Sequence, residues 1–85
     1  MKASARETVS AEVARILRAE RIKADLSMTT VGERAGLSHQ MVSFVEREMR
    51  SPTLDTLLRI TGALGISLGD VVQQAESAAM RHKTK

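Results

Sequence analysis

Three consecutive residues, Gly36, Leu37 and Ser38, most constrain how this 85-residue chain can fold. Glycine readily takes the left-handed conformation at a helix C-terminus, so Gly36 is expected to end a helix. Ser27 and Ser38 are of the type that caps helix N-termini with a side-chain oxygen. The spacing therefore predicts helices over 28–35 and 39–47, joined by a short turn with glycine first. Two helices in this arrangement form a helix-turn-helix, here centred on 27–47.

Helical signals also cover the rest of the chain. A first helix is expected to begin between 4 and 11 and to run to about 24, with Ser4 and Glu7 as a candidate capping box. Thr53 is the expected cap of a helix over 54–63, whose apolar surface comes from residues 54, 57, 58 and 60, and Gly65 ends it. Ser67 and Asp70 are a second candidate capping box, for a helix that begins at 68 and frays after 75.

These elements predict an all-α fold in a single domain. Alternating β-type runs are missing, and a chain of 85 residues buries only a modest core. Residues 1–75 are expected to form the helix-turn-helix domain, and residues 76–85 either a helix extension or a mobile basic tail.

Composition excludes several classes of protein. The chain has no cysteine, and its two histidines, His39 and His82, are too far apart for a zinc-ligand spacing, so no metal site is expected. The formal net charge of +3 suits a polyanionic partner. No apolar stretch is long enough to span a membrane and the N-terminus lacks a signal-peptide core, so the expected location is the cytoplasm. The one possible pairing of a nucleophile with a base is Ser38 beside His39. These residues are adjacent in sequence, and their side chains would point apart on a helix. No catalytic set is therefore found, and no enzyme is expected.

The predicted helix at 39–47 divides into two faces. Leu37, either Met41 or Val42, and Val45 are expected to face inward. The outward stripe has the spacing i, i+3, i+4, i+7, with His39 at its edge, and consists of Gln40, Ser43, Phe44 and Arg47. An aromatic residue is unusual on a face that only meets solvent.

The run from Leu26 to Val72 resembles the Cro and phage-repressor-like, or Xre-type, family of helix-turn-helix regulators. The pieces that carry the resemblance are ERAGLS, VERE, SPTLDTLLRI and ALGISLGDVV, in this order. The resemblance implies a compact five-helix, lambda-repressor-like domain of bacterial type, usually dimeric, with its third helix in the DNA major groove. It also implies that Arg21 pairs with Glu46 and thereby orients the third helix. The chain departs from the family at Met28, where glutamine is usual, and at Glu48, where glycine is usual.

Each residue of the predicted reading surface has a chemical role. Gln40 can bond bidentately to adenine, and Phe44 can touch a thymine methyl group. His39 can donate to guanine or to phosphate, while Ser43 is short and adaptable. The remaining candidates are expected near the DNA backbone, through side chains or through the N–H groups of the second and third helices: Ser27, Met28, Thr29, Ser38, Arg47 and Arg50.

Structural alternatives stand beside these roles. Phe44 could be a partly buried core residue, His39 a solvated first-turn residue and Met28 a packing residue. Arg47 could pair on the surface with glutamates near Glu46 or with Asp55. Gly32 is expected to allow close approach of the second and third helices.

The sequence thus predicts a sequence-specific DNA-binding transcriptional regulator that reads a palindromic operator as a homodimer. No cofactor or small-molecule ligand is expected. The dimer interface is expected at Leu64, Ile66, Leu68 and Val72 and on the continuation toward Met80, because the last two helices carry more apolar residues than one small core needs. The alternative is a protein-interaction module, such as an antitoxin that neutralises a toxin.

Overall fold

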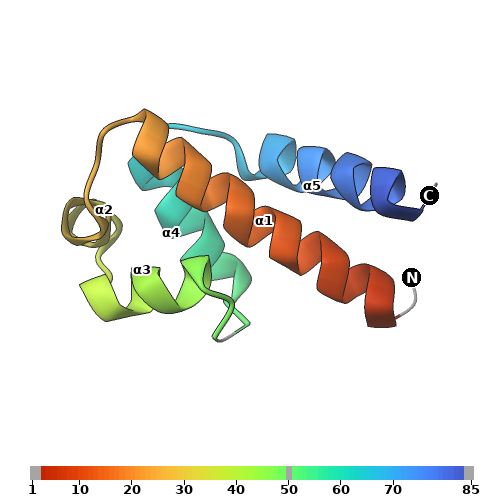
Figure 1. Cartoon of the computed structure of the whole chain (residues 1–85). Coiled ribbons are helices and arrows are strands. Elements are labelled where there is room, and N and C mark those ends of the chain that lie inside the picture. Colours follow the sequence, from red (N-terminus) through yellow and green to blue (C-terminus); the bar gives the residue numbers. More distant parts are fainter. Residues whose placement is uncertain (1–2, 50, 84–85) are drawn as a thin grey trace.

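The computed structural model describes residues 3–49 and 51–83, and these residues form five helices and no strand. The helices are α1 (Ala3–Lys23), α2 (Met28–Ala35), α3 (His39–Glu46), α4 (Leu54–Leu64) and α5 (Leu68–Lys83). Figure 1 shows α2, α3 and α4 gathered around one end of α1, while α5 runs along its other part. The predicted all-α, five-helix fold is confirmed.

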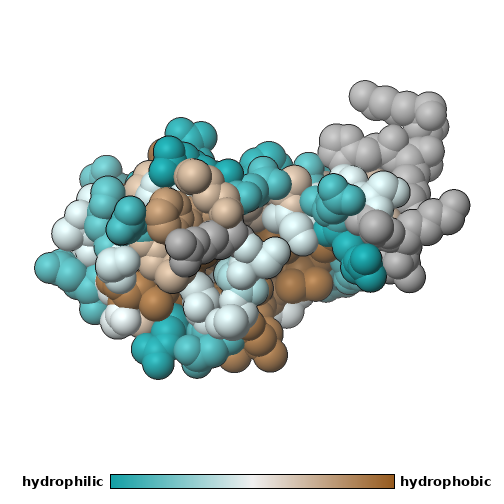
Figure 2. Space-filling model, turned by 90° about the horizontal axis from the view of Figure 1, so that it is seen from below, coloured by the Kyte–Doolittle hydropathy of each residue, from teal (hydrophilic) through white to brown (hydrophobic). Residues whose placement is uncertain are grey.

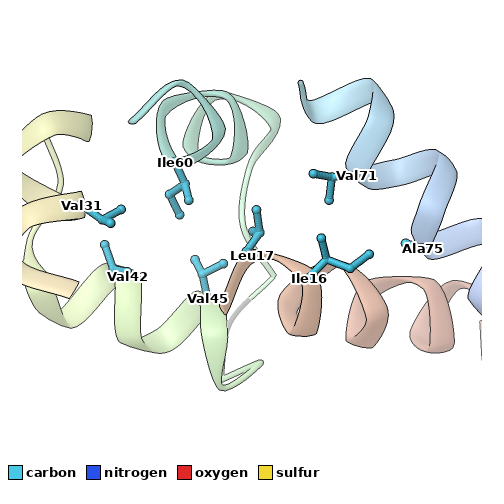
Figure 3. Close-up of a cluster of buried hydrophobic side chains, with 8 residues drawn as sticks. All are labelled: Ile16, Leu17, Val31, Val42, Val45, Ile60, Val71 and Ala75. Atoms are coloured by element: carbon cyan, nitrogen blue, oxygen red, sulfur yellow. The ribbon is translucent and has the colours of Figure 1, made fainter. Parts of the chain in front are cut away.

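One cluster of buried side chains joins the helices. Figure 3 shows that its members come from all five of them, and they are Ile16, Leu17, Val31, Val42, Val45, Ile60, Val71 and Ala75. Val42 is fully buried while Met41 is only half-buried, which decides between the two inward candidates on α3. Half-buried Leu57 also packs against this core, but Leu54 and Leu58 are exposed. The core therefore uses only part of the apolar surface that was expected of α4.

Hydroxyl groups cap four of the helices at their N-termini, as the sequence predicted. The side-chain oxygens of Ser27, Ser38 and Thr53 each accept a hydrogen bond from the backbone N–H three residues further on, at 3.0–3.1 Å. Ser67 accepts one from the N–H of Asp70 at 3.3 Å. These bonds satisfy donors that the first turn of a helix leaves without an intrahelical partner.

Four helices end in the same backbone motif, in which the residue after the C-cap is left-handed and two N–H groups bond back to the last turn. Gly36 and Gly65, both with φ of 70°, hold this position after α2 and α4, as predicted. Asp25 and Glu48, with φ of 59° and 58°, hold it after α1 and α3. The left-handed conformation of these two acidic residues was not predicted from the sequence.

Helices α1 and α5 pack antiparallel to one another. The start of α1 and the end of α5 both differ from the prediction. α1 begins at Ala3, so Ser4 lies inside the helix and does not cap it; its carbonyl accepts from the hydroxyl of Thr8 at 2.9 Å. α5 continues to Lys83 instead of fraying after Ala75. Small buried side chains let the two helices approach closely: Ala5, Ala14, Ala75, Ala78 and Ala79. Figure 1 shows both ends of the chain at the same end of this pair.

Candidate nucleic-acid interface

The outward stripe of α3 lies opposite the buried side chains of the same helix. Val42 and Val45 are 0% and 3% exposed, and helical spacing turns residues 40, 43, 44 and 47 away from them. Gln40 and Arg47 are exposed, while Ser43 and Phe44 are half-buried. The stripe thus presents an amide and a guanidinium at the surface, with a partly exposed ring between them.

The start of α3 is exposed and ordered by its cap. Ser38 accepts from the N–H of Met41 at 3.0 Å, so its hydroxyl oxygen is already engaged within the helix. His39 is exposed beside it, as expected for a residue at the edge of the stripe. The first-turn N–H groups of α3 that the cap leaves unbonded point along the helix axis, toward any group that approaches this end.

The start of α2 offers backbone groups more than side chains. The hydroxyl of Ser27 accepts from the N–H of Thr30 and donates to its hydroxyl, both at 3.0 Å, so it is used within the turn. Met28 is half-buried and packs against the core, in agreement with its packing interpretation. Thr29 is exposed, and its hydroxyl is the side-chain group left for an approaching phosphate.

Gly32 brings α2 against the turn that leads into α3. An added Cβ at this position would lie 2.6 Å from the carbonyl oxygen of Leu37 and 3.3 Å from the carbonyl carbon of Ser38. Because these neighbours are backbone atoms, a methyl group at this position would force the turn to move. The expected close approach at Gly32 is confirmed, and it sets the position of α3 relative to α2.

An ion pair between α1 and α3 holds the C-terminal end of α3. The guanidinium of Arg21 donates to both carboxylate oxygens of Glu46, at 2.7 and 3.0 Å, and to the carbonyl of Leu26 at 2.9 Å. The two side chains are only 12% and 4% exposed. The hydrogen bond to Glu46 raises the pKa of Arg21 although burial opposes the shift. The pairing that the resemblance implied is therefore present, and it is bidentate.

A second arginine links α4 to the end of α2, and the sequence did not predict it. Arg59 donates to the carbonyl of Ala35 at 3.2 Å and to the carboxylate of Asp55 at 2.8 Å. Its positive charge thereby meets a helix C-terminus, where cations are favoured. Asp55 is paired within its own helix and not with Arg47 as one alternative proposed. The i, i+4 spacing of Asp55 and Arg59 was the available sequence signal.

The segment after α3 turns through Glu48 in the left-handed conformation, with φ of 58°. The N–H groups of Glu48 and Met49 bond back to the carbonyls of Val45 and Phe44, at 3.2 and 2.9 Å. Arg50, a predicted phosphate contact, lies outside the described residues. Glu48 therefore keeps the turn that glycine usually makes in the family, at the cost of a strained backbone.

Charge is balanced over the helix-turn-helix segment. Residues 27–47 carry two arginines and two glutamates, so the segment has no net charge. Glu46 is paired with Arg21, which leaves Glu33 as the exposed acidic residue of the segment, together with two exposed arginines, Arg34 and Arg47. Recognition by this surface would depend more on shape and hydrogen bonding than on a basic patch.

The residues predicted for a dimer interface are all half-buried: Leu64, Ile66, Leu68 and Val72. Leu64 and Ile66 pack against the core of their own chain. Met80, toward which the predicted surface continues, is 68% exposed, and the other large exposed apolar side chains lie elsewhere, at Ile22, Met49, Leu54 and Leu58. Figure 2, which views the molecule from below, shows apolar groups reaching the surface in separate patches between polar ones.

An open groove of about 620 Å³ lies between α1 and the segment that joins α3 to α4. Its apolar part includes Val9, Val13 and Leu57, and Arg6 and Glu7 contribute charged groups. None of the four stripe residues of α3 lines it, so it is separate from the predicted reading surface.

Comparison with known proteins decides the family. A family model described as Helix-turn-helix matches residues 17–71, which is well over half of the chain and runs from the second half of α1 to the start of α5. The chain belongs to this helix-turn-helix family. The resemblance to Cro and phage-repressor-like regulators is thereby confirmed, and the chain has the helix-turn-helix DNA-binding fold of transcriptional regulators.

Two curated relatives of this helix-turn-helix chain come from Mycobacterium tuberculosis, from strains CDC 1551 / Oshkosh and H37Rv. Each is named an uncharacterized HTH-type transcriptional regulator and is 41% identical over 51 residues, or 60% of the present chain. The match spans about a third, 36%, of each relative's length. The crystal structure of ClgR, a clp gene regulator from C. glutamicum, superposes with a TM-score of 0.74 at 23% identity, over 82% of this chain and 91% of ClgR. This likeness shows the same fold.

Two further findings concern the described part of the chain. Among residues 3–49 and 51–83, no group of three acidic, histidine or cysteine side chains is placed to hold a metal ion. No helix in those ranges has both the length and the apolar character needed to cross a bilayer.

Proposed function

We propose that this helix-turn-helix protein is a sequence-specific transcriptional regulator, cytoplasmic, that binds palindromic double-stranded DNA as a homodimer. The observation that carries the proposal is the outward stripe of α3, with Gln40 and Arg47 exposed on either side of half-buried Ser43 and Phe44. In this family of folds such a helix enters the major groove, where an amide can read adenine and a ring can touch thymine.

Contacts to the DNA backbone would fix the register of the stripe. The N–H groups at the start of α2 and the hydroxyl of Thr29 would contact one phosphate, and the cap region of Ser38 and His39 another. Arg47 and Arg50 would add charge-assisted contacts. Two copies related by a two-fold axis would then read half-sites about 34 Å apart.

The experiment is selection of bound fragments from a random DNA pool, followed by binding measurements with two variants. Gln40→Ala is expected to lose discrimination at one base position per half-site, by about 1–3 kcal/mol. Arg50→Ala is expected to weaken binding to all sequences alike. Gln73→Ala is the matched control, because Gln73 is also exposed but lies on α5. If neither variant differs from the control on any selected fragment, the assignment of α3 to the major groove is wrong.

A second candidate function, a protein-interaction module such as an antitoxin, is favoured by one observation. With Glu46 paired to Arg21, the exposed side chains of the helix-turn-helix segment carry only one net positive charge, whereas nonspecific DNA affinity depends on basic residues. Failure to enrich any fragment from the random pool, together with a well-folded protein, would favour this alternative.

A further inference from the structure

The exposed face of α4 carries two leucines one helical turn apart. Leu54 is 66% exposed and Leu58 is 52% exposed, although Ile60 of the same helix is 3% exposed. At i, i+4 spacing the two side chains lie one above the other and form a single ridge. This is a continuous apolar surface that no part of the described chain covers.

The next position on this ridge is Gly62, which is exposed and has open space above it. A Cβ built on Gly62 would meet nothing within 4 Å outside its own helix, so no intramolecular packing accounts for a glycine here. Glycine inside a helix is unfavourable relative to alanine. The ridge is therefore tall at Leu54 and Leu58 and hollow at Gly62.

A parallel ridge beside it carries opposite charges. Asp55 and Arg59 are exposed, and their ion pair spans one turn at 2.8 Å. The exposed face of α4 thus has an acidic and a basic residue at the same spacing as its apolar residues. An antiparallel copy of this face would place opposite charges across from one another.

We propose that a second copy of this chain packs on this face of α4, about a two-fold axis through Leu58. The axis places Leu58 against Leu58 of the second copy, and Leu54 over the hollow at Gly62 of the second copy. Asp55 then lies beside Arg59 of the second copy, and the symmetry repeats each of these contacts. The ridges of residues four apart then run parallel in the two copies, with the helix axes crossing near −50°, and Gly62 leaves the room that Leu54 of the second copy needs.

This face is more exposed than the four residues expected from the sequence. Leu64 and Ile66 already contribute to their own core and Leu68 and Val72 are half-buried, whereas Leu54 and Leu58 are exposed. The 11-residue helix is roughly 16 Å long, so the contact is smaller than the ~800 Å² per partner of a stable complex. The dimer is therefore expected to be weak in solution and to be reinforced when both copies bind one operator. The inference rests on the proposed homodimer and names its surface.

The first test compares two glycine variants by sedimentation equilibrium and thermal unfolding. Gly62→Ala is expected to raise the melting temperature, because alanine favours helix, and to weaken self-association at least fivefold, because the hollow is filled twice per dimer. Gly69→Ala is the matched control. Its added methyl group would meet only the Ser67 hydroxyl at 3.5 Å, and self-association should not change. Equal association of the two variants would overturn the proposal.

The second test uses the absence of cysteine in the chain. Under mild oxidation Leu58→Cys is expected to form a disulfide-linked dimer, because a residue on the axis meets itself. Leu54→Cys and Gly62→Cys are expected to cross-link faster when mixed than when either is alone. Ser77→Cys, exposed on α5, is the control for random collision.

The outcomes separate this inference from the proposed function. Faster cross-linking of Val72→Cys than of Leu58→Cys would support the proposed homodimer but overturn the proposal that α4 forms its interface. A wild-type chain that sediments as a monomer up to millimolar concentration, without cross-linking at Leu58→Cys, would overturn both. Cross-linking at Leu58→Cys without affinity for any selected DNA would support the α4 surface and reject the proposed function.

Discussion

Single residues with unusual backbone geometry carry much of the strain in this chain. Glu48 is left-handed, a conformation that costs an ordinary L-residue roughly 1–2 kcal/mol and glycine almost nothing. Asp25 has the same geometry, but the short side chain of aspartate tolerates it better. The strain at the end of α3 is therefore the larger of the two.

Replacement of Glu48 by glycine is expected to stabilise the protein by about 1 kcal/mol, because the relief of strain exceeds the added freedom of the unfolded chain. For a domain of this size the melting temperature should rise by about 4–8 °C. Asp25→Gly should give a smaller rise. A Glu48→Ala variant, which keeps the strain, is the control, and an equal rise for it would contradict the explanation.

Gly32 needs to be glycine for a different reason: the neighbouring backbone leaves no room for a side chain. Gly32→Ala would place a methyl group 2.6 Å from the carbonyl oxygen of Leu37, and overpacking of this kind costs about 1–3 kcal/mol. Urea unfolding should show a lower midpoint although alanine favours helix. Gly62→Ala, with open space around it, should shift the midpoint upward. A Gly32→Ala protein as stable as wild type would show that the turn can move without cost.

At the scale of elements, α3 is held at its two ends by different means. Close backbone contact at Gly32 fixes its start, and the bidentate pair from Arg21 fixes its end. Arg59 attaches α4 to the last turn of α2. The orientation of α3 thus depends on residues that lie outside its exposed stripe.

Removal of one partner from the Arg21–Glu46 pair should leave a charge without its counterion in a poorly hydrated site. Glu46→Ala is expected to cost roughly 3 kcal/mol in urea unfolding, and Arg21→Met a similar amount. The double variant Arg21→Met, Glu46→Leu should recover part of this loss, because two apolar side chains replace the pair. A double variant less stable than both single variants would contradict the assignment.

The pH dependence of the same pair follows from the raised pKa of Arg21. A cation whose pKa is higher in the folded state stabilises the fold at every pH below its unfolded pKa, and loses this effect only as pH rises through the folded value. Both values lie far above neutral. The difference in unfolding free energy between wild type and Arg21→Met should therefore be constant from pH 7 to 10. A difference that shrinks across this range would mean that another group titrates with the pair.

For the whole molecule, the distribution of charge sets the expected salt dependence of DNA binding. Log affinity falls by about 0.9 per phosphate neutralised for each unit of log salt. If Arg47 and Arg50 supply the charged contacts of each copy, two copies should give a slope of about −4. Glu33→Lys should strengthen binding to all sequences and steepen this slope. Glu76→Lys makes the same charge change on α5 and should have a smaller effect, and equal effects would contradict the placement of DNA against α2 and α3.

The sequence predicted those parts of the fold that local chemistry determines. The caps at Ser27, Ser38 and Thr53 and the helix end at Gly36 depend only on nearby residues, and all are present. The outward stripe of α3 could also be predicted, because helical spacing relates it to Val42 and Val45.

Other features could not be predicted because they depend on what lies across the fold. The glutamate side chain does not mark Glu48 as left-handed, and the glycine usual at this position in the family was the one available signal. The length of α5 depends on alanine contacts with α1 rather than on strong apolar residues of its own. Leu54 and Leu57 look equally suited to a core, and only the position of α1 and α2 leaves the first of them outside.

The antiparallel pairing of α1 and α5 has a practical consequence for anyone who labels the protein. The chain enters and leaves at the same end of the molecule, and α2 and α3 are at the opposite end (Figure 1). The molecule measures 39 Å along its longest axis, so a fluorophore or an affinity tag attached near the start of α1 or the end of α5 would lie well away from α3. Fusions at the two termini should therefore be equally compatible with DNA, whereas an insertion between α3 and α4 should not.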